Sequence, residues 1–259
     1  MNIFNAPLAS HSALSDVYQT NTPKHISIQN MFDSDFINTL EKEFDKRLED
    51  KNNWKDPNRG FLERQLQLEE ANEFQNHEKK YKTGYNPSKN RLCDRLQTSL
   101  DGFPAINNLL DQLNSQDFLD FLTKLTGIGG LLPDPGRRSA GLHAGFQDGY
   151  LDIHTDQTWN PYIEAFSCIN VIIYLNSDWE DEWEGKLEFL DENCEQKLFE
   201  YNCVQNRTVI WTNSENIWHG YPSPLKCPEG KVRKCFTAFY HTKDRMFNVT
   251  KKTSAVWRG

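Results

Sequence analysis

The sequence predicts an α+β fold that is mainly β, with N-terminal helices packed on one sheet of a strand-rich core. Two observations predict it. Apolar residues recur at helical spacing in three stretches of the first 130 residues. After LLPDPG, short runs rich in β-branched and aromatic residues are separated by Gly and Pro, which is typical of strands and turns. Helices followed by a run of strands favour a β-sandwich or barrel with the helices on its outside.

The helical stretches carry the expected end signals. Asp33 or Ser34 can cap the first helix, which continues with Phe36, Ile37, Leu40, Phe44 and Leu48. The second helix follows Pro104. The third begins near Ser115, and Gly127 is well placed to end it.

Six runs in the second half of the chain are predicted strands. Residues 169–176 (INVIIYLN) are nearly all apolar, which predicts a central strand, whereas residues 186–191 (KLEFLD) alternate. The predicted strands are 139–146, 150–156, 166–176, 186–191, 206–213 and 234–242.

A chain of 259 residues is long enough for one sizeable core, and we expect a single domain over 1–259. Its mainly helical part is 1–130, its strand-rich core is 131–245 and its C-terminal tail is 246–259. The stretch 51–90 is very polar. We expect it to be a loop with a short element, and it is a candidate for a mobile lid.

The composition argues against several classes of protein. A net charge of −8 disfavours nucleic acid and anionic membranes as partners, because both attract a basic face. No apolar run approaches the roughly 20 residues that a membrane span needs. The first residues lack the apolar stretch of a secretory signal, and the six scattered cysteines form no CxxC. We therefore expect free thiols and a cytoplasmic protein.

One short motif carries candidate metal ligands. In DIHTD, the two-residue spacing on an extended chain places His154 and Asp156 on the same face. A distant histidine, His219 in NIWHGYP, can complete a set of two imidazoles and one carboxylate. Such a facial set leaves coordination positions open, as in non-haem Fe(II) oxygenases, whereas a structural zinc site is closed by four ligands. The His-x-Asp spacing alone is a weak signal, and a surface pair is the alternative.

A candidate anion-binding residue begins the strand RKCFTAFY. Strand alternation places Arg233 and Thr237 on one face, where a buried guanidinium needs a carboxylate partner. Lys234 falls on the opposite face and Lys231 in the preceding turn, so Arg233 is the preferred cation. On another strand, Tyr174 could donate a hydrogen bond to the same anion.

Residues 141–242 resemble the 2-oxoglutarate/Fe(II)-dependent oxygenase domain of the prolyl 4-hydroxylase type. The resemblance rests on GLHAGFQDGYLDIHTD, NVIIYLNSDWEDEWEGKLEFLD, NRTVIW and HGYPSPLKCPEGKVRKCFTAFYHT in this order. It implies a double-stranded β-helix, also called a jelly roll. It also implies that the protein is an enzyme that uses Fe(II), 2-oxoglutarate as co-substrate, and O₂.

The same resemblance implies roles for individual residues. Arg233 matches the residue that pairs with the distal carboxylate of 2-oxoglutarate. Tyr174 matches a tyrosine that hydrogen-bonds this co-substrate, and Thr237 matches a polar position near the same carboxylate. The residues that match the iron ligands are His154, Asp156 and His219.

Two positions depart from the family pattern. The family usually has Gly-Gly where this chain has Glu184-Gly185, and Arg-x-Ser where it has Arg233-Lys234-Cys235. Neither departure touches a predicted metal ligand, so both bear on the substrate. Related halogenases lack the carboxylate ligand, which frees a site for chloride. The presence of Asp156 therefore favours hydroxylation.

Three further residues are candidates for the substrate pocket. His143 lies on a strand leading to the site, and we expect it to line the pocket rather than bind metal. Trp159 follows the metal motif, where it either lines the substrate mouth or only packs. Arg137 follows a Pro-Gly turn and could meet a substrate carboxylate, with a solvated loop as the alternative.

The predicted reaction is hydroxylation of an unactivated C–H bond. The resemblance implies an amino acid or a peptidyl residue as substrate, with proline as the typical target. The same chemistry on another small metabolite of a biosynthetic pathway is the alternative. A non-catalytic jelly-roll binding protein is a third hypothesis, against which the intact ligand set and Arg233 count.

Overall fold

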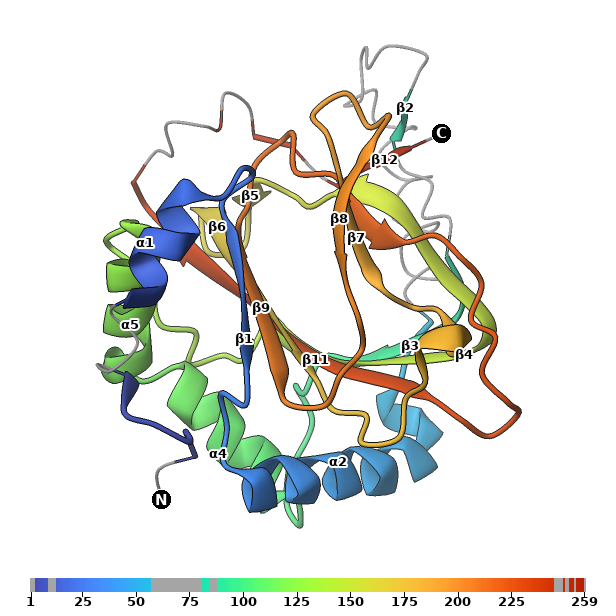
Figure 1. The fold of residues 1–259 in the computed structure, drawn as a ribbon. Coiled ribbons are helices and arrows are strands. Elements are labelled where there is room, and N and C mark those ends of the chain that lie inside the picture. The colour runs from blue at the N-terminus through green and yellow to red at the C-terminus, as the bar shows by residue number, and fades with distance from the viewer. Residues whose placement is uncertain are drawn as a thin grey trace.

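Twelve strands in the described part of the chain form one antiparallel sheet that curls into a barrel (Figure 1). The computed structural model describes residues 3–8, 13–56, 81–83, 88–244, 249, 252–253 and 255–258. Neighbouring strands follow the order β1-β9-β6-β11-β4-β10-β7-β8, and β2, β3, β5 and β12 pair off this path. The strands are β1 (His25–Gln29), β2 (Tyr81–Thr83), β3 (Ser88–Asp94), β4 (Ala140–Thr155), β5 (Trp159–Asn160), β6 (Ala165–Tyr174), β7 (Leu187–Leu190), β8 (Lys197–Tyr201), β9 (Arg207–Thr212), β10 (His219–Tyr221), β11 (Arg233–Thr242) and β12 (Val256–Arg258).

The long strand β4 joins the two halves of the barrel. Its first half lies between β11 and β3, and its end lies between β10 and β12. Gly149 lies between these two parts, where a Cβ atom would sit 2.6 Å from the carbonyl oxygen of Phe146 and 2.8 Å from that of Asn90. Only glycine allows such a close backbone approach. This arrangement of strands confirms the predicted jelly roll.

The helices lie together on one side of the barrel (Figure 1). The three predicted helices are confirmed, with the predicted end signals. Asp33 accepts hydrogen bonds from the Asp35 and Phe36 amides, Ser115 accepts one from the Phe118 amide, and Gly127 ends its helix at φ 76°. The helices are α1 (Ala13–Thr20), α2 (Ser34–Glu49), α4 (Pro104–Leu113) and α5 (Gln116–Thr126).

Strand β11 separates two apolar layers. Phe236 and Tyr240 face the helices, and the Tyr240 hydroxyl donates to the Leu113 carbonyl of α4 over 2.9 Å. Cys235 faces the barrel interior, where it packs with Tyr174 and neighbouring aromatic side chains. The predicted phase of this strand is therefore confirmed, and the interior face is the one that begins with Arg233.

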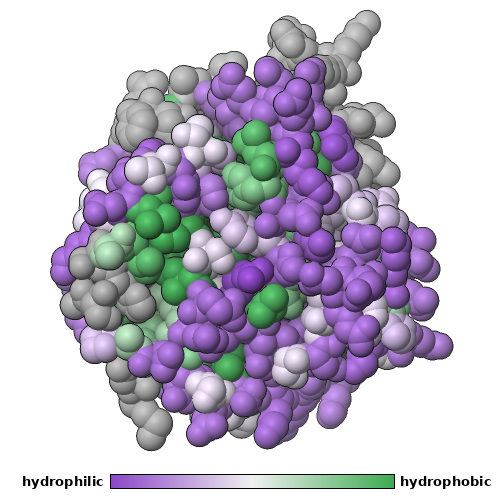
Figure 2. Space-filling view, in the orientation of Figure 1, coloured by the Kyte–Doolittle hydropathy of each residue, from purple (hydrophilic) through white to green (hydrophobic). Residues whose placement is uncertain are grey.

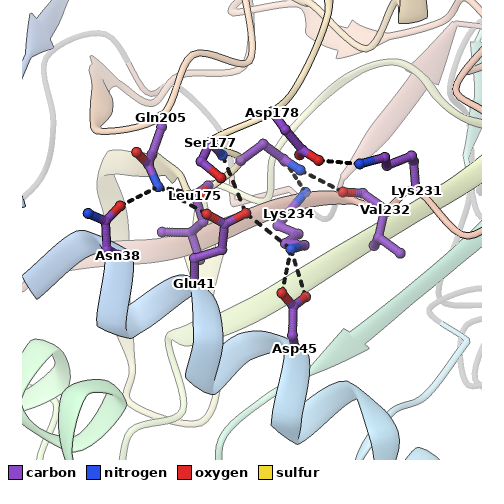
Figure 3. A network of polar contacts seen from close by, with 11 residues as sticks. Asn38, Glu41, Asp45, Leu175, Ser177, Asp178, Gln205, Lys231, Val232 and Lys234 are labelled. Carbon is purple, nitrogen blue, oxygen red and sulfur yellow. Dashed lines mark hydrogen bonds and ion pairs between the residues drawn. The ribbon is translucent and has the colours of Figure 1, made fainter. Parts of the chain in front are cut away.

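A polar network holds α2 against the outer face of β11 (Figure 3). The Lys234 ammonium donates to Glu41 over 3.1 Å and pairs with Asp45 over 2.7 Å. The Lys234 amide donates to the side-chain oxygen of Asn176, and Gln205 donates to Glu41 over 3.0 Å. Lys234 thus takes its carboxylate partners outside the barrel, while its neighbour Arg233 points inside.

The part of the chain predicted to be mainly helical also supplies strands. β1 extends the sheet beside β9, and β3 pairs with β4, so both are additions to the predicted architecture. The expected lid lies mostly outside the described residues, because 57–80 and 84–87 are not among them.

The surface in the view of Figure 2 is largely hydrophilic, with smaller hydrophobic patches between polar side chains. The exposed large apolar residues of the described part are Val17, Tyr162, Leu198 and Val204. Each helix in that part is too short or too polar to span a bilayer.

Candidate active site

The three predicted metal ligands meet inside the barrel, at the end of β4 and the start of β10. His154 and His219 are direct partners in the antiparallel pairing of these strands, which places their side chains on the same face. The Nε2 atom of His154 lies 3.6 Å from one oxygen of Asp156, and Nε2 of His219 lies 3.3 Å from the other. One ligand atom of each residue lies within 4.8 Å of the other two. This spacing suits a single bound cation.

Backbone carbonyls fix which imidazole nitrogen faces the centre. Nδ1 of His154 is 2.9 Å from the Asp152 carbonyl, and Nδ1 of His219 is 3.0 Å from the Ile217 carbonyl. A carbonyl only accepts, so each Nδ1 carries the proton and each Nε2 has a free lone pair. Both lone pairs are therefore available to a metal ion, in the arrangement common to metal-binding histidines.

The electrostatics of the cluster also suit metal binding. Burial lowers the pKa of His154, and the adjacent His219 lowers it further. Burial alone would raise the pKa of Asp156, but the adjacent imidazoles of His219 and His154 outweigh this effect and hold that pKa below its usual range. Neutral imidazole and ionised carboxylate are the forms that bind a cation.

Asn170 of β6 contacts the metal cluster directly. Its side-chain amide donates to Oδ2 of Asp156 over 2.5 Å, and the residue is only 1% exposed. The strand phase of the sequence places Asn170 on the same face as Tyr174, but it gives no sign of the contact with Asp156. Asn170 restricts the rotation of that carboxylate.

Arg233 is a buried cation with polar contacts but no carboxylate partner among the described residues. It is 3% exposed, and its neighbours include the thiols of Cys203 and Cys235 and the phenols of Tyr174 and Tyr221. Its Nε donates to the Gly185 carbonyl over 2.8 Å, and Nη2 donates to the Tyr174 hydroxyl over 3.3 Å. Because an unpaired buried charge is costly, this guanidinium suits an anionic ligand inside the barrel.

The departure Glu184-Gly185 lies directly against Arg233. Gly185 has a φ of +82°, and a Cβ there would lie 2.7 Å from Leu225 Cδ2 and 2.9 Å from Arg233 Cδ. Glycine at position 185 therefore makes room for the Arg233 side chain. Glu184 has φ 64° and ψ −154°, a conformation that non-glycine residues rarely adopt. This strained residue stands where the family usually has the first Gly.

Tyr174, Thr237 and His143 line the interior beside Arg233. Burial raises the pKa of Tyr174 well above 10, so its phenol stays protonated and can donate. Nε2 of His143 is 3.0 Å from the Thr237 hydroxyl. Burial, and then the charges of nearby arginines, keep the pKa of His143 well below 6.5, so this imidazole is neutral. The structure thus brings these three predicted residues together.

Tyr221 and Arg91 also belong to this group of side chains, and neither was predicted. Two guanidinium groups lie near the ring of Tyr221. The guanidinium of Arg233 is 4.3 Å from the ring centroid, and that of Arg91 is 5.5 Å from it. Both arginines are register partners of Gly145 on β4, one from each side. Two-residue spacing from His219 could have indicated Tyr221. Nothing in the polar stretch around Arg91 indicates that it forms a strand.

The other two pocket candidates lie in different places. Trp159 follows the metal motif, packs edge-on against Phe166 at 4.9 Å, and has the Lys252 ammonium 3.4 Å from its ring centroid. Arg137 donates to Asn107 and pairs with Asp111 of α4 over 2.9 Å. It therefore lies on the helix-covered side of the sheet, and the structure does not bring it to the metal cluster.

The family model of the 2OG-Fe(II) oxygenase superfamily matches residues 141–241. No curated protein matches the chain.

Several solved structures share the fold. A prolyl hydroxylase from Trichoplax adhaerens, in complex with a hypoxia inducible factor peptide fragment, has a TM-score of 0.55 at 15% identity and covers 91% of this chain and 92% of its own. A Pseudomonas putida prolyl-4-hydroxylase has a TM-score of 0.56 at 12% identity, covering 89% and 98%. HygX from Streptomyces hygroscopicus, with nickel and 2-oxoglutarate bound, has a TM-score of 0.50 at 12% identity and covers 88% of both chains.

Proposed function

We propose that this chain, whose residues 141–241 match the 2OG-Fe(II) oxygenase superfamily, is a 2-oxoglutarate/Fe(II)-dependent oxygenase of the prolyl 4-hydroxylase type that hydroxylates an unactivated C–H bond of an amino acid or peptidyl residue. The residues that would hold iron are His154, Asp156 and His219. The observation that carries the proposal is the buried Arg233, whose guanidinium lacks a carboxylate partner among the described residues and lies in the same barrel as this cluster.

The residues present fit both Fe(II) and 2-oxoglutarate. The metal cluster offers two imidazoles and one carboxylate, and so leaves further coordination positions open. Arg233 would pair with the distal carboxylate of 2-oxoglutarate, while the Tyr174 phenol and the Thr237 hydroxyl would donate hydrogen bonds to it. Iron bound with this co-substrate supplies the chemistry of O₂ activation and C–H oxidation.

The chain's own residues orient the reaction and exclude water. Asn170 fixes one face of Asp156, and the Asp152 and Ile217 carbonyls hold the two imidazoles in one tautomer. Asp156 would supply the carboxylate ligand that related halogenases lack, which supports hydroxylation over halogenation. Tyr221 shields the Arg233 guanidinium with its ring.

A proline-type substrate is supported by the fold shared with two prolyl hydroxylases, one of them bound to a peptide. Trp159 and His143 would contribute to the pocket. Another small metabolite is the second candidate. A non-catalytic binding role is disfavoured, because such a role needs neither the complete metal cluster nor an unpaired buried arginine.

A cytoplasmic location is also part of the proposal. All six cysteines are buried and carry free thiols, which suits a reducing compartment. The partners we propose are a small-molecule or peptide substrate rather than nucleic acid, in keeping with the net charge of −8.

The oxygenase proposal is tested by Fe(II)-dependent formation of succinate from 2-oxoglutarate. His154→Ala should abolish turnover through the metal and Arg233→Ala through the co-substrate. Lys234→Gln is the matched control, because this neighbouring cation points out of the barrel toward α2. The proposal fails if the wild type binds neither Fe(II) nor 2-oxoglutarate without oxygen.

The identity of the substrate is tested by measuring which compounds stimulate the turnover of 2-oxoglutarate. Free proline, short prolyl peptides and a panel of other amino acids and metabolites are added at equal concentration, and succinate formation is compared with the rate without substrate. We expect a proline-containing compound to stimulate turnover and to gain one oxygen atom by mass. Stimulation by an unrelated metabolite alone would favour the second candidate.

A further inference from the structure

The last described residues of the chain lie beside the segment of the chain that carries His154. We call residues 252–253 and 255–258 the C-terminal strap. The Thr158 amide donates to the Thr253 carbonyl over 3.0 Å, and the Thr253 amide donates to the Thr158 hydroxyl over 2.8 Å. Farther along, Val256 pairs with Thr155 and Trp257 with His154. The contacts of Thr253, Val256 and Trp257 all fit one antiparallel register beside residues 154–158, in which β12 (Val256–Arg258) is the paired strand.

Two charged contacts fix the ends of the strap. The Lys252 ammonium lies 3.4 Å from the centroid of the Trp159 ring. At the other end, Arg258 pairs with the Asp152 carboxylate over 3.0 Å. The backbone carbonyl of Asp152 is the acceptor for Nδ1 of His154, so Arg258 holds the residue that orients this imidazole.

Trp257 lies directly on the imidazole of His154. The two ring centroids are 4.3 Å apart, and the planes are inclined by only 19°. His219 lies on the other flank of His154, with centroids 4.5 Å apart. The three aromatic side chains therefore form a row across β10, β4 and β12. In this row the His154 imidazole lies between His219 and Trp257.

The face of the indole, rather than its N–H, makes the contact. Trp257 is 4% exposed, and its Nε1 has no hydrogen-bond partner among the described residues. The hydrogen bond from Nδ1 to Asp152 leaves the imidazole of His154 free to rock about that bond. A flat aromatic ring stacked at this distance blocks that motion and keeps Nε2 directed at the cluster.

We propose that the C-terminal strap belongs to the metal centre and that Trp257 is a positioning residue for His154. The inference rests on the proposed function, in which His154 holds iron. The inference adds a requirement for a flat ring at position 257. The segment that supplies this ring was predicted from the sequence only as a C-terminal tail. The competing view is that the strap merely completes the edge of the sheet beside β4.

The test measures metal binding rather than turnover. Mn(II) affinity is measured by the electron paramagnetic resonance of free Mn(II), and Co(II) absorption reports the ligand field. Trp257→Leu should weaken Mn(II) binding by about tenfold, the usual lower bound for residues that orient a ligand, and should shift the Co(II) bands. Trp257→Phe keeps a flat ring and should stay within about threefold of the wild type.

Trp54→Leu is the matched control for lost stability. Trp54 is also buried, but it packs on Phe44 and donates to the Arg47 carbonyl of α2. It should bind Mn(II) like the wild type while it melts at a lower temperature. All variants are measured well below their melting temperatures.

Three outcomes overturn the inference: Trp257→Leu binding Mn(II) as tightly as the wild type, an equal loss of affinity in Trp54→Leu, or an equal loss in Trp257→Phe. Failure of the proposed function has a different signature. In that case His154→Ala would bind Mn(II) as tightly as the wild type, whatever the substitution at Trp257 does.

Discussion

The turn Glu184-Gly185 offers a pair of substitutions with opposite expected effects. In Gly185→Ala, the new methyl group would lie 2.7 Å from Leu225 and between 2.9 and 3.0 Å from two atoms of Arg233. Overpacking of this kind costs about 1–3 kcal/mol. The φ of +82° adds about 1–2 kcal/mol for a residue with a Cβ. We therefore expect Gly185→Ala to lower the free energy of unfolding by about 2–5 kcal/mol.

The same substitution should weaken co-substrate binding. Arg233 is the flexible neighbour, so it must yield, and its Nε would leave the Gly185 carbonyl that now lies 2.8 Å away. A guanidinium displaced from its bidentate geometry loses about 1.5–3 kcal/mol of charge-assisted bonding, which is roughly a 10- to 100-fold loss of affinity for 2-oxoglutarate.

Glu184→Gly should act in the opposite direction on stability. It relieves a backbone strain of about 1–3 kcal/mol at φ 64° and ψ −154°. Glycine costs about 0.5–1 kcal/mol in entropy, and the loss of the exposed pair with Lys226 costs up to about 1 kcal/mol. These contributions sum to a net effect between a loss of about 1 kcal/mol and a gain of about 2.5 kcal/mol, with a gain of somewhat less than about 1 kcal/mol at the middle values, and with unchanged affinity for 2-oxoglutarate.

Both variants are measured by urea unfolding and by anaerobic titration of 2-oxoglutarate with Mn(II) present. The decisive comparison is between the affinities of the two variants for 2-oxoglutarate, since only Gly185→Ala should change this affinity. Wild-type affinity in a folded Gly185→Ala protein would refute the argument that Gly185 makes room for Arg233. A loss of stability by more than about 1 kcal/mol in Glu184→Gly would refute the assignment of strain to Glu184.

Three further predictions concern single residues. Asn170→Leu removes the hydrogen bond to Asp156 and should weaken Mn(II) binding by about tenfold; equal binding would show that the carboxylate needs no such support. Arg91→Gln removes one of the two cations beside Tyr221 and should weaken 2-oxoglutarate binding by about fivefold at low salt and less at high salt, as calorimetric titration would measure; an effect that ignores salt would contradict it. Burial lowers the pKa of His241 from 6.5 to about 4. Its unfolded form therefore binds a proton that the folded form does not, so stability is full above pH 6.5 and falls between pH 6.5 and 4 by about 3 kcal/mol. His241→Gln should flatten this part of the curve of unfolding free energy against pH, and an unchanged curve would contradict the prediction.

Local sequence patterns predicted much of the fold. The helix ends lie at the predicted capping residues, which are Asp33, Ser115 and Gly127. Capping could be predicted because it depends on neighbouring residues in the chain. Strand phase correctly separated Arg233 from Lys234, because alternation along a strand is a local property. The strand β3 was not recognised, since its polar residues are paired only by contact with β4.

The sequence by itself determined the type of chemistry. Two-residue spacing brings His154 to Asp156, and a resemblance of ordered motifs brings in His219, Arg233 and Tyr174. Those are properties of residue identity and strand phase, which the chain carries before it folds.

Only the tertiary structure decided what surrounds these groups. Asn170, Arg91 and Trp257 reach the site from three other strands, β6, β3 and β12, and the contacts of Arg137 with α4 hold it away from the site. The physical reason is that sheet register and packing, rather than local spacing, determine which distant residues become neighbours.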